Sequence, residues 1–128
     1  MRARTLVAAV AALTALSLGA CRRDFDHSKE AMALTGGDPD EGKKLIQAYG
    51  CGSCHVIPGI PGARNTVGPS LAEIGGQSFV GGVVQHTPEN LIRWIQDPQK
   101  IDSLSAMPNL GLTEGQARHI AAYLYKIQ

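Results

Sequence analysis

Two thiols and an imidazole lie within five residues of one another, in the segment YGCGSCHVIPG at residues 49–59. Cys51, Cys54 and His55 can all bind metals, and the thiols can also form covalent bonds through sulfur. Three kinds of site fit this spacing: a disulfide or redox-active dithiol, a structural zinc site, and the covalent attachment of a haem.

The rest of the chain gives little support to the first two kinds of site. A redox dithiol of the C-x-x-C type usually lies beside a βαβ pattern, and the sequence has no such pattern. A structural zinc ion needs four ligands, but there is no second cysteine pair, and His86 and His119 lie far apart in the sequence. A bare disulfide would leave His55 without a role.

C-x-x-C-H as a unit is typical of c-type haem attachment. The two thiols lie on one turn, so they can reach the two vinyl groups of the porphyrin and form thioethers. His55 then lies under the ring, where it can bind the iron. The sequence therefore predicts one covalently bound haem c, attached through Cys51 and Cys54, with His55 as an axial ligand.

The second axial ligand has to come from a distant part of the chain, on the other face of the haem. Of the three methionines, Met1 lies in a predicted signal peptide and Met32 in a predicted tether, so only Met107 lies in the predicted domain. A lone methionine is usually a core residue, and His86 is the alternative ligand. We favour Met107 because it lies in a loop before the last helix and Pro108 restricts its backbone.

Ligation by methionine and histidine fills both axial positions and raises the reduction potential of the iron. Such an iron has no open position for oxygen, peroxide or a small-molecule substrate. The sequence therefore predicts a one-electron carrier and not an enzyme. Two alternatives are a haem sensor or minor peroxidase with a labile sixth ligand, and a fixed haem subunit of an oxidase or dehydrogenase complex.

Residues 1–20 are predicted to be a signal peptide of the lipoprotein type. Arg2 and Arg4 give a basic start, and residues 6–20 are mostly apolar or small. This run is too short and too rich in alanine for a convincing membrane span. The sequence LGAC that ends at Cys21 resembles a bacterial lipobox, which predicts lipidation of Cys21 and a location on the periplasmic side of a bacterial membrane. An ordinary signal peptide with a chance cysteine is the alternative.

Residues 21–37 are predicted to be a lipid-anchored flexible tether, because they are charged and lack a sustained apolar period. The domain then spans residues 38–128. The net charge of the whole chain is only +1, which gives no support for nucleic-acid binding.

The domain is predicted to be all-α, with helices that start after Asp38, Thr87 and Thr113. The first two starts combine a capping residue with proline, and the third has a capping box that ends at Gln116. Long loops rich in proline and glycine connect the helices, and residues 79–84 are predicted to be loop as well. So small a domain buries little surface of its own, so we expect a cofactor to fill its centre.

These residues together resemble class I cytochromes c over most of residues 38–128. The matching positions are Gly42, Cys51-x-x-Cys54-His55, Gly68-Pro69, Met107-Pro108 and IAAYL at residues 120–124. The segments TPENLIRW at residues 87–94 and Asp97-Pro98 are most similar to bacterial cytochrome c domains associated with, or fused to, haem–copper oxidase subunit II. The resemblance implies a small cytochrome c fold, with three to five helices and long loops around one haem.

The resemblance also implies roles for residues outside the haem motif. Pro69 would accept a hydrogen bond from Nδ1–H of His55, and Leu71 would pack on the haem. Trp94 would donate its indole N–H to a haem propionate, or serve simply as a core residue of its helix. Gly42 would allow the first and last helices to cross closely.

Two positions depart from the family pattern. Gln77 stands where related sequences often have an arginine that pairs with a propionate, which leaves that group exposed or paired with Arg64 or Arg93. Ile46 stands where the family often has an aromatic residue. The partners implied by the resemblance are redox proteins: a terminal oxidase, a quinol–cytochrome c reductase or a dehydrogenase.

Overall fold

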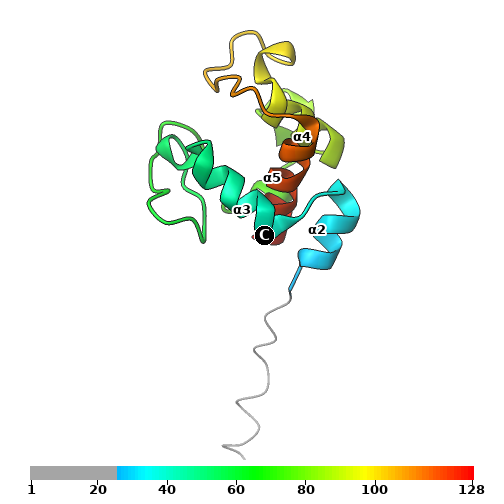
Figure 1. The fold of residues 1–128 in the computed structure, drawn as a ribbon. Coiled ribbons are helices and arrows are strands. Elements are labelled where there is room, and N and C mark those ends of the chain that lie inside the picture. The colour runs from blue at the N-terminus through cyan, green and yellow to red at the C-terminus, as the bar shows by residue number, and fades with distance from the viewer. Residues whose placement is uncertain (1–25) are drawn as a thin grey trace, which may run out of the picture.

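The computed structural model describes residues 26–128, so the predicted signal peptide and Cys21 lie outside the described residues. The described part is mostly helical, as predicted, with long connecting loops (Figure 1). Its α-helices are α2 (Ser28–Thr35), α3 (Pro39–Ala48), α4 (Pro88–Gln96) and α5 (Glu114–Lys126). Short 3₁₀ turns are η1 (Cys51–Ser53), η2 (Ile74–Gly76) and η3 (Pro98–Lys100), and the strands are β1 (Phe79–Val80) and β2 (Val84–Gln85).

Helix α5 lies at the centre and contacts α2, α3 and α4 (Figure 1). Its crossing with α3 is close at Gly42, where an added Cβ would lie 1.9 Å from the backbone oxygen of His119. Only glycine fits such an approach. The predicted close crossing of the first and last helices is therefore confirmed.

The predicted helix starts are confirmed by their caps. The Asp38 carboxylate accepts hydrogen bonds from the backbone N–H groups of Asp40 and Glu41, which hold the pKa of Asp38 below its usual range. Thr87 caps α4, and Thr113 forms a capping box at α5. These local signals set where the helices begin.

Helix α2 differs from the predicted flexible tether. Ala31 and Thr35 are each 1% exposed and lie one turn apart, on the face that packs against α5. Arg118 of α5 donates a hydrogen bond to the carbonyl of Thr35 at 2.9 Å. The sequence does not predict this helix, because its buried side chains are small and one of them is polar, so it lacks an apolar stripe.

The hairpin of β1 and β2 differs from the predicted loop at residues 79–84. Phe79 pairs with Gln85, and Val80 with Val84. The glycines that interrupt the strand pattern make the turn instead, because Gly81 and Gly82 have φ angles of 58° and 76°.

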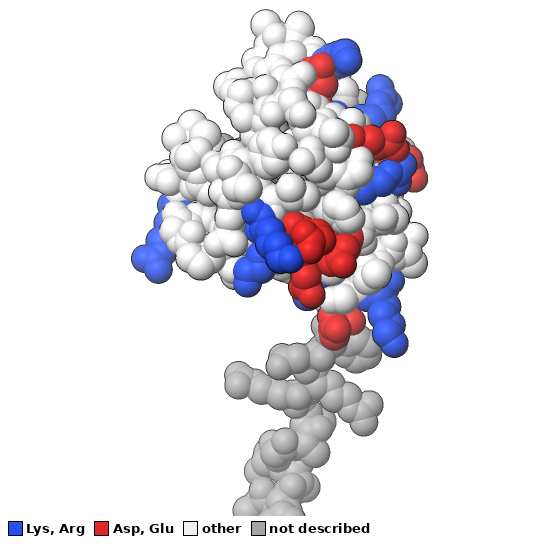
Figure 2. All heavy atoms as spheres, in the orientation of Figure 1, with Lys and Arg blue, Asp and Glu red and all other residues white. Residues whose placement is uncertain are grey.

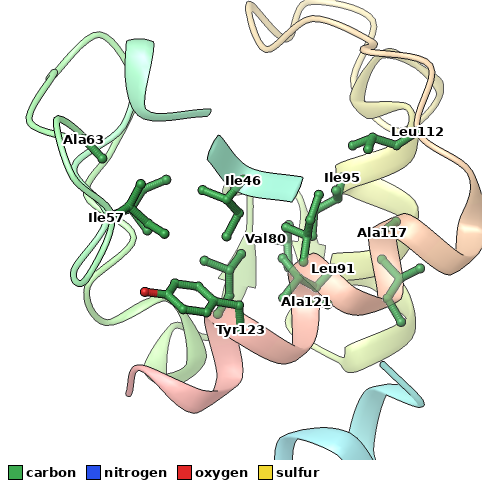
Figure 3. Packing of buried hydrophobic residues seen from close by; sticks show 14 residues of the cluster. Ile46, Ile57, Ala63, Val80, Leu91, Ile95, Leu112, Ala117, Ala121 and Tyr123 are labelled. Atoms are coloured by element: carbon green, nitrogen blue, oxygen red, sulfur yellow. The ribbon is translucent and has the colours of Figure 1, made fainter. Parts of the chain in front are cut away.

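The core joins loop residues to helical ones. Ile57 and Ala63, from the loop after η1, belong to the same buried cluster as Ile46 of α3 and Tyr123 of α5 (Figure 3). This loop is therefore part of the packed domain even though it has little regular structure.

Candidate functional site

A cavity of about 460 Å³ lies between the loop that follows α3 and the loop that precedes α5. All the predicted site residues within the domain line it: Cys51, Cys54, His55, Pro69, Leu71, Trp94 and Met107. The structure thus brings together residues that are far apart in the sequence.

The wall of this cavity is predominantly apolar. Helices contribute Ile46, Leu91, Ile95 and Leu124, among others. Asp102 is the one lining residue, among those that the structure describes, with an acidic, lysine or arginine side chain. An apolar wall with few polar groups suits a large, mostly hydrophobic ligand.

The turn η1 presents both thiols to the cavity. Gly50, with φ 69°, leads from α3 into this turn, and the backbone N–H groups of Cys54 and His55 both donate to the carbonyl of Cys51. No disulfide joins Cys51 and Cys54. Burial raises the pKa of the Cys51 thiol, with a smaller contribution from the neighbouring Cys54.

A backbone hydrogen bond orients the imidazole of His55. Its Nδ1–H donates to the carbonyl of Pro69 at 2.7 Å, which is the hydrogen bond that the resemblance implies. This bond leaves Nε2 without a proton and with a lone pair for a metal. The ring is thus oriented by the protein's own backbone.

Gly68 is a further residue of the site, and the sequence alone gives no sign of its steric role. A Cβ at this position would lie 2.4 Å from Cε1 of His55. The N–H of Gly68 also donates to the carbonyl of Cys54 at 2.8 Å. The glycine before Pro69 therefore lets the loop pass close behind the histidine ring.

Met107 and Trp94 line other parts of the cavity, and both are half-buried. The backbone N–H of Met107 donates to Oγ of Ser105. The ring of Trp94 packs on the backbone of the hairpin turn, because a Cβ on Gly81 would lie 2.2 Å from it. The role of Trp94 as a hydrogen-bond donor to a propionate stays a prediction.

The other histidines of the domain are engaged elsewhere. His86, the alternative axial ligand, does not line the cavity; its Nδ1 is 2.9 Å from the carbonyl of Gln77, and its ring stacks on Tyr125. His119 accepts a hydrogen bond from the backbone N–H of Asp38 at 2.8 Å. Neither Arg64 nor Arg93, the proposed partners of a propionate, lines the cavity.

Within residues 26–128, no group of three or more histidine, cysteine, aspartate or glutamate side chains could hold a metal ion. None of the helices in the same range is long and apolar enough to cross a membrane.

The family model for cytochrome c matches residues 39–128. The match shows that the chain belongs to the cytochrome c family, as the haem motif and the helical fold predict. The chain is also similar to "Cytochrome c oxidase subunit 2" of Bacillus sp. (strain PS3), with 30% identity over 83 residues. That alignment covers 61% of this chain and 23% of the relative, so the chain spans about a quarter of the relative's length. No solved structure matches the chain.

The cofactor of this family is haem c, bound covalently, and the residues present fit it. Two thiols on one turn, an imidazole with its free nitrogen fixed, and an apolar cavity are the features that such a group requires. Cys51, Cys54 and His55 would hold it.

Proposed function

We propose that this protein is a one-electron carrier: a membrane-anchored c-type cytochrome that passes electrons between a respiratory donor and a terminal oxidase or a similar acceptor. The observation that carries the proposal is that His55 and Met107, from two separate loops, line the same cavity as Cys51 and Cys54. This arrangement supports a haem iron with both axial positions filled by the protein.

The haem supplies the one-electron redox chemistry, and the protein residues decide how it is used. Cys51 and Cys54 would retain the cofactor, and His55 is oriented by Pro69 so that its other ring nitrogen could bind iron. Met107 would bind from the other side and exclude external ligands. The apolar wall would limit the contact of a bound haem with water, which favours electron transfer with little rearrangement.

The composition of the cavity favours a carrier over a peroxidase. General acid–base chemistry needs a titratable side chain beside the reacting atoms. The residues that line the cavity around Met107 are instead Ser105, Ala106, Pro108, Leu110 and Leu112, with Asp102 as the only acid among the described lining residues.

The proposed acceptor is an oxidase because the relative is an oxidase subunit. A quinol–cytochrome c reductase or a dehydrogenase is the proposed donor. Acidic and basic side chains lie beside one another on the face shown in Figure 2. The chain from Cys21 onwards has 10 lysines and arginines, because Arg2 and Arg4 are among the 12 of the full sequence, against 11 aspartates and glutamates, so its net charge is −1. We therefore expect weak, transient docking with little long-range electrostatic steering.

The proposed anchor is a lipid on Cys21, which would place the domain on the periplasmic side of the membrane. Replacing this cysteine (Cys21→Ser) should release the protein from the membrane fraction. If the variant stays in that fraction, lipidation at Cys21 is not what holds the protein.

The axial ligand is tested by Met107→Ala. The oxidised wild-type protein should show an iron–sulfur charge-transfer band, and the variant should lose it completely. Met32→Ala is the matched control, because Met32 lies on α2 with 47% of its surface exposed and should leave the band unchanged. Survival of the band in Met107→Ala would show that another residue binds the iron.

A haem sensor or minor peroxidase with a labile sixth ligand is the second candidate. It is favoured by the small number of hydrogen bonds that hold the Met107 loop. This candidate predicts that carbon monoxide binds to the reduced native protein at neutral pH, and the carrier predicts that it does not.

A fixed haem subunit of an oxidase or dehydrogenase complex is the third, favoured by the similarity to an oxidase subunit. Purification of the membrane complexes in mild detergent distinguishes it, because a fixed subunit would copurify in constant proportion.

A further inference from the structure

The side chain of Gln99 reaches from η3 into the loop that carries Met107. Its amide nitrogen Nε2 donates to the carbonyl of Ser105 at 3.2 Å and to the carbonyl of Met107 at 2.5 Å. Gln99 is half-buried, so these bonds are partly protected from water. One amide group thus contacts the backbone of the proposed axial ligand directly.

The rest of this loop has few connections to the domain. Its other hydrogen bonds are local: Ser105 and Leu104 bond to Asp102, Met107 to Ser105, and Gly111 to Asn109. Among the described residues, the two bonds from Gln99 are the only hydrogen bonds that join residues 103–112 to any residue outside 101–112.

The element that carries Gln99 is itself well fixed. Pro98 is fully buried, and the carboxylate of Asp97 accepts a hydrogen bond from the backbone N–H of Lys100. The carbonyl of Pro98 also accepts hydrogen bonds from the backbone N–H groups of Ile101 and Asp102. The side chain of Gln99 therefore extends from the well-packed turn η3 to the Met107 loop, which has few other hydrogen bonds to the domain.

We infer that Gln99 is a positioning residue for the axial ligand: by binding the carbonyls of Ser105 and Met107, it keeps the thioether of Met107 directed into the cavity. The inference rests on the proposed ligation by Met107. Without these bonds residues 103–112 lose their only hydrogen bonds to η3 among the described residues, and the state in which Met107 has left the iron becomes more populated. Two hydrogen bonds of ordinary net strength correspond to about a 5- to 150-fold change in that equilibrium.

The test uses the full-length, haem-loaded protein and two variants, Gln99→Glu and Gln99→Leu. The first keeps the shape of the side chain and removes its donors, and the second removes the donors without adding charge. The matched control is Gln96→Glu, because Gln96 is also half-buried but does not line the cavity. Imidazole is the probe, since it binds oxidised iron only where Met107 has left.

We expect both Gln99 variants to weaken the iron–sulfur band and to bind imidazole about 5- to 150-fold more tightly than the wild type. The Gln96→Glu control should match the wild type in both measurements. Imidazole affinities equal to the control would overturn the positioning role of Gln99 while leaving the ligation by Met107 intact. An effect in Gln99→Glu but not in Gln99→Leu would also overturn it, because the added charge and not the lost donors would be responsible.

Absence of the iron–sulfur band from the wild-type protein is a different outcome. It would overturn the ligation by Met107, and with it the role inferred for Gln99. The band in the wild type and the imidazole affinity of the variants therefore separate the two failures.

Discussion

The two loops that enclose the cavity are held in different ways. In the His55 loop (residues 50–71), backbone hydrogen bonds cross the loop from Ile57 to Ala63, from Gly68 to Cys54 and from Leu71 to Val56. Its apolar side chains Ile57, Ile60 and Ala63 are buried. The loop is thus internally bonded and anchored in the core.

The Met107 loop (residues 101–112) has fewer backbone hydrogen bonds and fewer buried apolar side chains than the His55 loop. Residues 106–112 take part in no backbone–backbone hydrogen bond with any described residue. Leu112 is its buried hydrophobic residue, whereas Leu104 is 90% exposed. Segments with few buried contacts and few backbone bonds open at a lower free-energy cost.

The two proposed axial ligands are therefore held to the domain with different strength. The His55 side is held by backbone hydrogen bonds and by side chains buried in the core. The Met107 side depends on a few side-chain contacts. We expect any exchange of ligands at the iron to begin with Met107.

The largest expected difference between the loops is in their contribution to stability. Ile57→Ala removes a core side chain that is 2% exposed, and should lower the free energy of unfolding by about 2–5 kcal/mol. Leu104→Ala should change it by no more than about 0.5 kcal/mol. Denaturant unfolding of the haem-loaded variants measures both, and equal effects would show that the loops are anchored alike.

Gly68→Ala should have the next largest effect. The added Cβ would overlap the His55 ring, 2.4 Å away at Cε1, and overpacking of this kind costs about 1–3 kcal/mol. The ring has to move, so the absorption spectrum of the haem should change as well. Gly115→Ala is the control, because a Cβ there meets nothing within 4 Å. A variant with a normal spectrum and normal stability would show that the loop adjusts freely behind the ring.

Tyr123→Phe should have the smallest effect of the three. The hydroxyl of Tyr123 donates to the carbonyl of Pro58 at 2.7 Å and so joins α5 to the His55 loop. Its loss should cost about 0.5–1.5 kcal/mol, measured by denaturant unfolding. The matched control is Tyr125→Phe, whose hydroxyl makes only a 3.4 Å contact with His86.

The contribution of Tyr123 should also depend on pH. Burial raises the pKa of Tyr123, so the neutral phenol is favoured in the folded state. The advantage of the wild type over Tyr123→Phe should be complete below the unfolded pKa of about 10 and decline as the pH rises through the higher folded pKa. An advantage that stays constant through this range would show that the phenol does not titrate with folding.

The parts of the fold and site that the sequence predicts are those fixed by local chemistry. Asp38 and Thr113 cap helices through bonds to residues two or three positions away. The spacing of Cys51, Cys54 and His55 is local as well, because it places both thiols on one turn and the imidazole directly after them. Met107 could be singled out because no other methionine lies in the predicted domain.

The parts that the sequence does not predict depend on partners distant in the chain. Helix α2 is stabilised by Arg118, far away in α5, and its own residues carry little helical pattern. From the sequence alone, Gly81 indicates a break in a strand. In the fold it lies against the ring of Trp94, where a side chain would not fit. Gln99 looks like an ordinary polar residue, because only the folded loop brings the carbonyl of Met107 to its amide.

The docking of α2 has a consequence for how the protein would meet its partners. The packed part of the chain already includes Ser28–Thr35, so only the short stretch from Cys21 to Asp26 separates the proposed lipid from the described residues. Five peptide units extend to at most about 18 Å. A domain held on so short a linker would search for its acceptor by lateral diffusion in the plane of the membrane, and the acceptor would have to offer its entry point for electrons within reach of that linker and the domain on it.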